Sequence, residues 1–291
     1  MNIKSNLILL VAFVGLLSCA TKNQNKVDTT GKTIDKELKE DYELVWQDEF
    51  DYSGLPDTTK WLYDTEGNEA GWGNNEAQFY TEKRIENAKV ENGILNVTAQ
   101  KEDFKNKKYT SARLISKVDW KYGKFETRAK VPPGRGTWSA IWMMPGGWSF
   151  NDGNWPDIGE FDIMEHVGHE SGVIHASAHS KDYQWQKGTQ QTDTIHITDA
   201  TETFHSYTWE WTPKVVKAYV DDQLYFEYKN EGLGVTKWPY EKPFYLILNV
   251  AIGGAWGSQQ GIDDGAFPQT MEVDYVRVYQ KKKFNNHNSI N

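Results

Sequence analysis

The side chains of this chain best suited to chemistry are three acids in the run Gly-Glu-Phe-Asp-Ile-Met-Glu-His. Carboxylates are costly to bury among bulky apolar residues, so this pattern indicates that the acids serve a purpose. Because side chains alternate faces along a strand, Glu160 and Asp162 share one face. Glu165 joins that face only if a β-bulge accommodates one extra residue, at Ile163 or Met164.

Two carboxyl groups on one surface are the equipment of glycoside hydrolysis, in which one attacks carbon and the other protonates the leaving oxygen. An acidic strand face can also be merely solvated, or it can hold a cation. A zinc site is a further alternative, because potential ligands follow the acids: His166, His169, Glu170, His175 and His179. Their spacing matches neither H-E-x-x-H nor H-x-x-E-H, and those motifs need a helix, so zinc is disfavoured.

Short runs of alternating residues predict the strands that would position these acids. The run 124–131 alternates charged and uncharged side chains, and no stretch shows a helical period over three turns. Further strands are expected at 94–99, 110–117, 173–180, 205–211, 215–220, 244–250 and 271–279. Many short strands separated by Gly, Asn, Asp and Pro predict an all-β sandwich or barrel, in which a concave sheet can hold a polymer.

Aromatic residues make up 14% of the chain, with 13 tryptophans. Trp72, Trp148, Trp155 and Trp256 lie in glycine-rich or proline-flanked segments where a core does not obviously need them. Indole rings can stack on the apolar faces of sugars while their N–H groups bond hydroxyls. Core packing remains the default for any single tryptophan, but the set favours a carbohydrate groove.

The first forty residues predict export and a tether. Residues 1–18 contain Lys4 and then a short apolar run, which is typical of a signal peptide and too short for a permanent membrane span. Leu16-Leu17-Ser18-Cys19 resembles a lipobox, and Cys19 is the single cysteine of the chain. We therefore expect lipidation at Cys19 and anchoring to a bacterial membrane, at the outer membrane or cell surface.

The expected domain organisation follows from composition. Residues 19–41 comprise the lipidated cysteine and a polar tether, 42–280 the folded domain and 281–291 a disordered tail. The formal net charge of −9 argues against nucleic acids and anionic polymers as partners and suits a neutral substrate. We expect a monomer.

Several motifs, in order along the chain, resemble family 16 glycoside hydrolases of the laminarinase type. The acidic run is similar to the bulged active-site motif of that family. Further matches are Gly71-Trp72-Gly73-Asn74-Asn75-Glu76-Ala77-Gln78-Phe79-Tyr80-Thr81, Ser111-Ala112-Arg113-Leu114, Tyr122-Gly123-Lys124-Phe125-Glu126, Gly136-Thr137-Trp138-Ser139-Ala140-Ile141-Trp142-Met143 and Leu248-Asn249-Val250-Ala251-Ile252-Gly253-Gly254. The resemblance implies a β-jelly-roll of two curved antiparallel sheets with a concave cleft. It also implies retaining endo-β-1,3-glucanase activity on polymers such as laminarin.

The resemblance also implies the roles of individual residues. Glu160 would be the nucleophile, Glu165 the general acid and base, and Asp162 the partner that orients Glu160. Trp138 and Trp142 would form walls of the subsite, although core packing is an even alternative for both. The remaining substrate contacts would come from Asn75, Arg113, His179 and Trp256.

No cofactor is expected for catalysis, but the resemblance implies a structural calcium ion. The carbonyl oxygens of Glu49 and Gly93 and the carboxylate of Asp274 would hold it. The alternative is that Asp274 merely pairs with Arg277 or Lys281. Other functions remain open: the same chemistry on mixed-linkage β-1,3-1,4-glucan or a galactan, or a glucan-binding lipoprotein that does not cleave. The loop 146–155 is expected to influence this choice.

Overall fold

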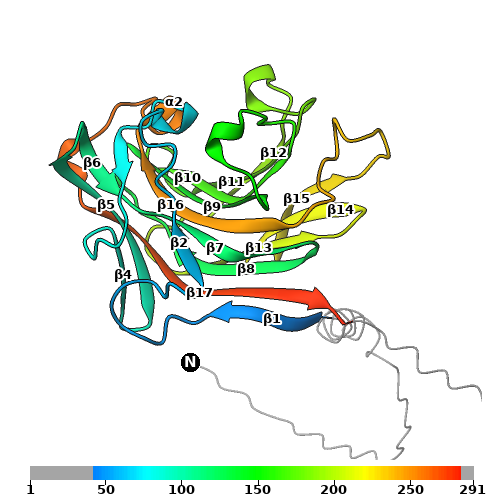
Figure 1. Ribbon diagram of the computed structural model, residues 1–291, viewed down its shortest axis with the longest axis horizontal. Helices are drawn as coiled ribbons and strands as arrows, with labels where there is room; N and C mark the ends of the chain where they lie inside the picture. Colours follow the sequence, from blue (N-terminus) through cyan, green and yellow to red (C-terminus); the bar gives the residue numbers. More distant parts are fainter. Residues whose placement is uncertain (1–41, 283–291) are drawn as a thin grey trace, which may run out of the picture. The chain divides into compact units, whose positions relative to one another are not determined.

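The computed structural model describes residues 42–282, which form two stacked, curved β-sheets (Figure 1). We call the seven-stranded sheet the cleft sheet; its order is β12-β11-β10-β9-β16-β7-β2. Its strands are β2 (Trp61–Tyr63), β7 (Arg113–Trp120), β9 (Thr137–Pro145), β10 (Glu160–Val167), β11 (Val173–His179), β12 (Gln191–His196) and β16 (Phe244–Ile252).

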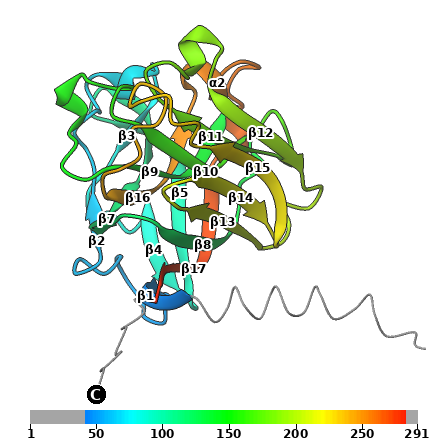
Figure 2. The same cartoon turned by 90° about the vertical axis from the view of Figure 1, so that its right-hand side faces the viewer.

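The ten-stranded sheet, called the outer sheet, has the order β15-β14-β13-β8-β17-β5-β6-β3, with β1 beside β17 and β4 beside β5. Figure 2 shows β15, β14, β13 and β8 in succession. Its strands are β1 (Tyr42–Asp48), β3 (Gln78–Tyr80), β4 (Ala88–Glu91), β5 (Ile94–Phe104), β6 (Lys107–Ser111), β8 (Gly123–Lys130), β13 (His205–Trp211), β14 (Val215–Val220), β15 (Gln223–Lys229) and β17 (Gln269–Lys281).

Helical structure among residues 42–282 is limited to single turns. They are η1 (Gly71–Gly73), η2 (Phe150–Asp152), η3 (Trp185–Lys187), α2 (Gly254–Gly257) and η4 (Asp264–Ala266). No helix in this part of the chain is long and apolar enough to cross a membrane. The predicted all-β sandwich is confirmed, with one exception to its antiparallel pairing: β3 and β6 run parallel.

The core lies between the sheets and is rich in aromatic rings. Phe161 of β10 stacks on Tyr240 and Phe244, with ring centroids 4.2 and 5.1 Å apart, and touches Trp209 and Trp211 of β13. All five side chains are fully buried. Burial of each such ring contributes about 1.5–3 kcal/mol. The apolar residues of β10 therefore fix the strand to the core and leave its acids on the other face.

The runs expected from the sequence located eight of the 17 strands of residues 42–282. The expected runs did not include β1, β2, β3, β4, β9, β12 and β15. The runs 205–211 and 215–220 coincide with β13 and β14. The predicted single strand 110–117 was wrong, because the chain leaves the outer sheet after Ser111 and enters the cleft sheet at Arg113. Both halves alternate in the same way, so their sequence gives no sign of the change of sheet.

Candidate active site

A β-bulge in β10 places the three acids on one face of the cleft sheet. Against β9, Asp162 pairs with Trp142 and Met164 pairs with Ile141, so Ile163 has no partner of its own. Ile163 and Met164 are both buried in the core. Glu160, Asp162 and Glu165 all line one cleft. This confirms the bulge that the spacing predicted, and it shows why two successive apolar residues separate the last two acids.

Each of the three acids has a polar neighbour, and each neighbour comes from a different segment of the chain. Trp155 Nε1 donates to Glu160 Oε2 at 2.9 Å, and Trp138 Nε1 donates to Glu165 Oε1 at 2.9 Å. His179 lies opposite Glu160 in β11, and its Nε2 is 3.1 Å from Asp162 Oδ2 and 3.9 Å from Glu160 Oε1. One tryptophan N–H thus orients each glutamate, while the histidine faces the aspartate between them.

Burial makes these carboxyl groups hard to ionise. Desolvation, together with the neighbouring Asp162, raises the pKa of Glu160 to about 8 and that of Glu165 to about 8. Desolvation also raises the pKa of Asp162 to about 8. Like charges this close oppose full ionisation, so the group holds protons near neutral pH. A site of this kind can provide one ionised and one protonated carboxyl group at the same time.

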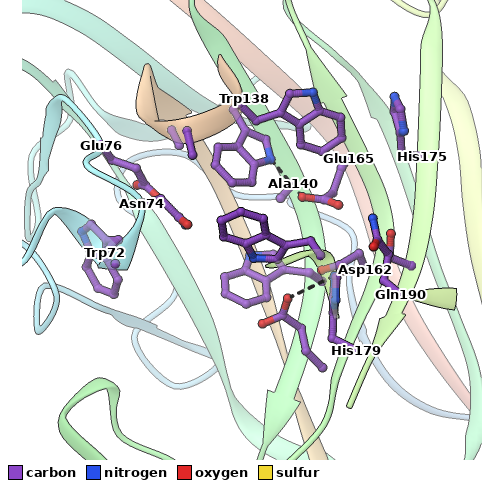
Figure 3. Close-up of a pocket in the computed structure, with 18 of the residues that line it drawn as sticks. Trp72, Asn74, Glu76, Trp138, Ala140, Asp162, Glu165, His175, His179 and Gln190 are labelled. Atoms are coloured by element: carbon purple, nitrogen blue, oxygen red, sulfur yellow. Dashed lines mark hydrogen bonds and ion pairs between the residues drawn. The ribbon is translucent and has the colours of Figure 1, made fainter. Parts of the chain in front are cut away.

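The acids lie on the floor of a cleft of about 730 Å³ whose walls are largely aromatic. Figure 3 shows Trp72, Asn74 and Glu76 on one side and His175, His179 and Gln190 on the opposite side. Both groups contribute to the lining of the cleft. The cleft therefore crosses the strands of the sheet, which suits a chain-like ligand, and its rings and polar groups suit a sugar.

The two predicted wall tryptophans lie on β9 beside the acids. Trp138 stands over Glu165 and meets Trp256 of α2 edge to face at 5.6 Å. Trp142 Nε1 donates to Asn249 Oδ1 at 2.7 Å. Both residues line the cleft, and neither is part of the main core between the sheets. Trp142 also packs against a small buried cluster of Met144, Tyr245 and Ile247, so it combines both roles.

Arg113, another predicted contact, lines the cleft but is held among protein groups. Its guanidinium lies over the rings of Trp72 and Trp142, at 4.2 and 4.6 Å, and its Nε is 3.0 Å from Asp64 Oδ2. Arg113 is 4% exposed. A cation packed between two indole faces stiffens this wall of the cleft.

The structure does not bring Asn75 to the cleft. Asn75 is exposed and has a left-handed φ of 57°, and the cleft is lined by its neighbours Asn74 and Glu76. The sequence Asn74-Asn75-Glu76 sits in a tight turn after η1, where Trp72 also has a positive φ of 54°. Which of two adjacent asparagines points inward depends on this backbone conformation, and the sequence gives no sign of it.

Sequence reasoning missed other groups of the cleft. Glu76 is 7% exposed, and its pKa is raised by burial although Gln78 Nε2 donates to it at 2.6 Å. Trp155 was expected in the groove, but its hydrogen bond to Glu160 was not foreseen. The position of Trp155 after a long loop, five residues before Glu160, was the available signal.

The structure does not assemble the zinc site considered above. Within residues 42–282, the group of three potential ligands that converges is Glu160, Asp162 and His179, with ligand atoms within 4.8 Å of one another. His175 instead contacts Glu170, at 3.0 Å. His166 is fully buried, and burial lowers its pKa to about 4.

The residues expected to bind calcium lie on three segments of the outer sheet. Asp274 is in β17, Glu49 directly follows β1, and Gly93 directly precedes β5, and both of these strands pair with β17. The Asp274 carboxylate, however, forms an ion pair with Arg128. This partner is neither Arg277 nor Lys281, the two residues considered from the sequence. Asp274 would have to release Arg128 to bind a metal. Calcium here stays a prediction.

Comparison with known proteins agrees with this fold. Residues 75–277 match the model of the glycosyl hydrolases family 16. The chain therefore belongs to this family and is a glycoside hydrolase. A beta-glucanase of Rhodothermus marinus is 51% identical over 246 residues, which cover 82% of this chain and 85% of that protein.

Solved structures of similar proteins share the architecture. A laminarinase from Rhodothermus marinus is 49% identical with a TM-score of 0.79, and the match covers 83% of this chain and 98% of that one. A non-specific endo-β-1,3(4)-glucanase of family 16 is 45% identical with a TM-score of 0.78, covering 83% of this chain and 92% of the other.

Proposed function

We propose that this chain is a retaining endo-β-1,3-glucanase that hydrolyses laminarin-like polymers. The observation that carries the proposal is a single strand face with three carboxyl groups, at the floor of an aromatic cleft that crosses the sheet. The similarity to laminarinases and β-glucanases supports the same substrate class. A cleft of this kind admits the interior of a long chain, as endo cleavage requires.

In the first step, Glu160 attacks the anomeric carbon while Glu165 donates a proton to the departing oxygen. The products are a covalent glycosyl-enzyme and a shortened glucan. In the second step, Glu165 removes a proton from water, which attacks the same carbon and releases Glu160 as a carboxylate. Two inversions give net retention of configuration. No metal or other cofactor is needed for either step.

The contacts of the two glutamates are alike: burial and Asp162 raise the pKa of each, and a tryptophan N–H lowers it. The division of labour therefore follows the family motif, with Glu160 as the nucleophile and Glu165 as the general acid. A raised pKa favours the proton that a general acid needs. Asp162, whose Oδ2 lies 3.1 Å from His179 Nε2, has the assigned role of orienting Glu160.

The proposal is tested by measuring reducing-sugar release from laminarin, mixed-linkage glucan and agarose. The parent chain is compared with Glu160→Gln and with Glu272→Gln, a control on the outer sheet whose side chain pairs with Lys130. We expect laminarin cleavage by the parent and the control and none by Glu160→Gln. Binding of laminarin without cleavage by any of the three would refute the enzymatic function.

A second candidate substrate is mixed-linkage β-1,3-1,4-glucan. The similarity to a non-specific endo-β-1,3(4)-glucanase favours it. The chemistry at the acids would be unchanged, and only the sugar contacts along the walls would differ. In the same assay, comparable kcat/KM values on laminarin and mixed-linkage glucan would establish this broader specificity.

We also propose that the protein is exported and anchored to a bacterial membrane by lipid at Cys19. The support is the Leu16-Leu17-Ser18-Cys19 pattern after an apolar run, and these residues lie outside the described range 42–282. The proposed signal peptide and tether, 1–41, lie there too, as does the predicted tail 281–291 from residue 283 on; its first residue, Lys281, is the last residue of β17. Cys19→Ala should abolish incorporation of labelled fatty acid and move the protein to the soluble fraction; unchanged labelling would contradict this.

A further inference from the structure

The β12 side of the cleft carries a tryptophan for which the reaction at the acids has no use. Trp185 lines the cleft together with Gln186 and Gln190, yet it remains 46% exposed. Single exposed apolar residues are common on protein surfaces. This one differs because it continues the wall of a cleft that binds a polymer, beside two amide side chains.

The segment that carries Trp185 is anchored and not a loose loop. The turn η3 (Trp185–Lys187) follows Asp182, whose N–H donates to the Thr236 carbonyl at 3.0 Å and whose Oδ2 accepts from Thr236 Oγ1 at 2.9 Å. After the turn, Thr189 Oγ1 donates to the Asp182 carbonyl at 2.8 Å. In Figure 1, η3 is the yellow-green turn above β12. These bonds hold the backbone that carries Trp185 in place before any ligand arrives, as a binding platform requires.

Trp185 also lies at a distance from the acids. Trp185 belongs to η3, which precedes β12, and β12 is the second strand from β10 in the cleft sheet. At about 4.8 Å per strand spacing, β12 lies about 10 Å from β10. Thr192 and Thr194 of β12 also line the cleft, so its lining continues from the acids to this side of the sheet, and a sugar bound there is not the sugar that is cleaved.

We propose that Trp185, Gln186 and Gln190 form a distal subsite in which a glucan residue stacks on the indole and hydrogen-bonds the two amides. This inference rests on the proposed glucanase function and adds a determinant of chain length to it. An indole face matches the apolar face of a pyranose ring, and amides match its hydroxyls. The subsite makes long glucans better substrates than short ones, because only long chains reach it.

The test compares the full chain with Trp185→Ala, Trp185→Phe and Leu224→Ala. Leu224 is also 46% exposed but lies in β15, outside the cleft lining, so it controls for loss of an exposed apolar side chain. We measure kcat/KM on laminarin and on β-1,3-oligosaccharides of increasing length. Trp185→Ala should lower kcat/KM on the long substrates roughly tenfold, equivalent to about 1.4 kcal/mol. It should leave the shortest cleaved oligosaccharide unaffected, and Trp185→Phe should retain most of the activity.

An equal loss on substrates of every length, or no loss, would overturn the subsite. Binding of the same oligosaccharides to Glu160→Gln, with and without Trp185→Ala, is measured by calorimetry in parallel. If the parent cleaves no glucan but long oligosaccharides bind more weakly without Trp185, the proposed function fails and the subsite stands. If cleavage occurs but neither binding nor kcat/KM depends on Trp185, the subsite alone fails.

Discussion

Strands β10 and β17 both alternate acidic with apolar side chains, but the molecule gives their carboxylates different neighbours. On the outer sheet, Glu272 of β17 is 2.8 Å from Lys130, and Asp274 pairs with Arg128. On β10, no lysine or arginine from residues 42–282 forms an ion pair with an acid, and His179 is the basic partner. The outer acids are half-buried and neutralised, whereas the cleft acids are desolvated without a full cationic partner.

This difference separates acids that serve stability from acids that serve chemistry. A carboxylate paired with arginine keeps a low pKa, as the Arg277 hydrogen bonds do for Glu49. The β10 acids have raised pKa values because the fold leaves burial uncompensated. Such a local conflict between sequence and environment is expected at a functional site.

The largest effect is expected from removing one carboxyl group of the cleft sheet, compared with removing one of the outer sheet. Glu165→Gln should lower kcat on laminarin by about 10²–10⁴-fold, because the leaving oxygen loses its acid. Glu272→Gln, which removes an acid of the outer sheet, should leave kcat unchanged. Steady-state kinetics on both variants decides the matter; a similar loss in the two would mean that the contrast between the sheets has no catalytic meaning.

Neutralising a cleft acid should stabilise the fold. The pKa of Glu160 is about 8 in the folded protein and about 4.3 unfolded, so the native state binds more protons and loses stability as pH rises between these values. Glu160→Gln removes this cost while its amide oxygen can still accept from Trp155. Its free energy of unfolding should exceed that of the parent by on the order of 1–3 kcal/mol at pH 8, with no difference at pH 4.

Denaturant unfolding at pH 4, 6 and 8 measures this trend. A variant less stable than the parent at pH 8 would show that the acid contributes to folding.

The loop 146–155 offers a test within the cleft itself. The Glu66 carboxylate accepts hydrogen bonds from Ser149 Oγ, the Phe150 N–H and Asn151 Nδ2, at 2.5, 3.1 and 2.6 Å. Glu66→Ala should release the loop that carries Trp155 and lower kcat/KM severalfold, through small misplacement of catalytic groups. The control is Glu69→Ala, which removes an exposed acid of the same segment. Equal kcat/KM values for the two variants would show that the hydrogen bonds of Glu66 to the loop have no role in catalysis.

The smallest effect is expected on the outer sheet. Glu49→Gln removes a carboxylate whose pKa is lowered by Arg277, so it removes stability that is present above the unfolded pKa and lost as pH falls through the folded one. The loss at pH 7 should be below about 1 kcal/mol, as for other partly exposed pairs. The change in the free energy of unfolding is therefore opposite in sign to the change expected for Glu160→Gln. Denaturant unfolding at pH 7 measures it, and a gain in stability would erase the distinction between the sheets.

Local alternation was enough to predict about half of the strands and the shared face of the acids, but not the change of sheet between Ser111 and Arg113. The spacing of the acids also predicted a bulge at Ile163 or Met164, and the register against β9 leaves Ile163 without a partner. Contacts between distant segments could not be read in this way. The partner of Asp274 is Arg128 because β8 happens to neighbour β17, and Asn75 turns outward because of its positive φ.

The central claim is that Glu160 and Glu165 cooperate in a double displacement. Proton NMR of laminarin hydrolysis, recorded within the first minutes and before mutarotation, identifies the anomer released at the new reducing end. The account predicts the β-anomer, because two inversions restore the original configuration. Initial release of the α-anomer would mean that water attacks directly, and it would contradict the role assigned to Glu160.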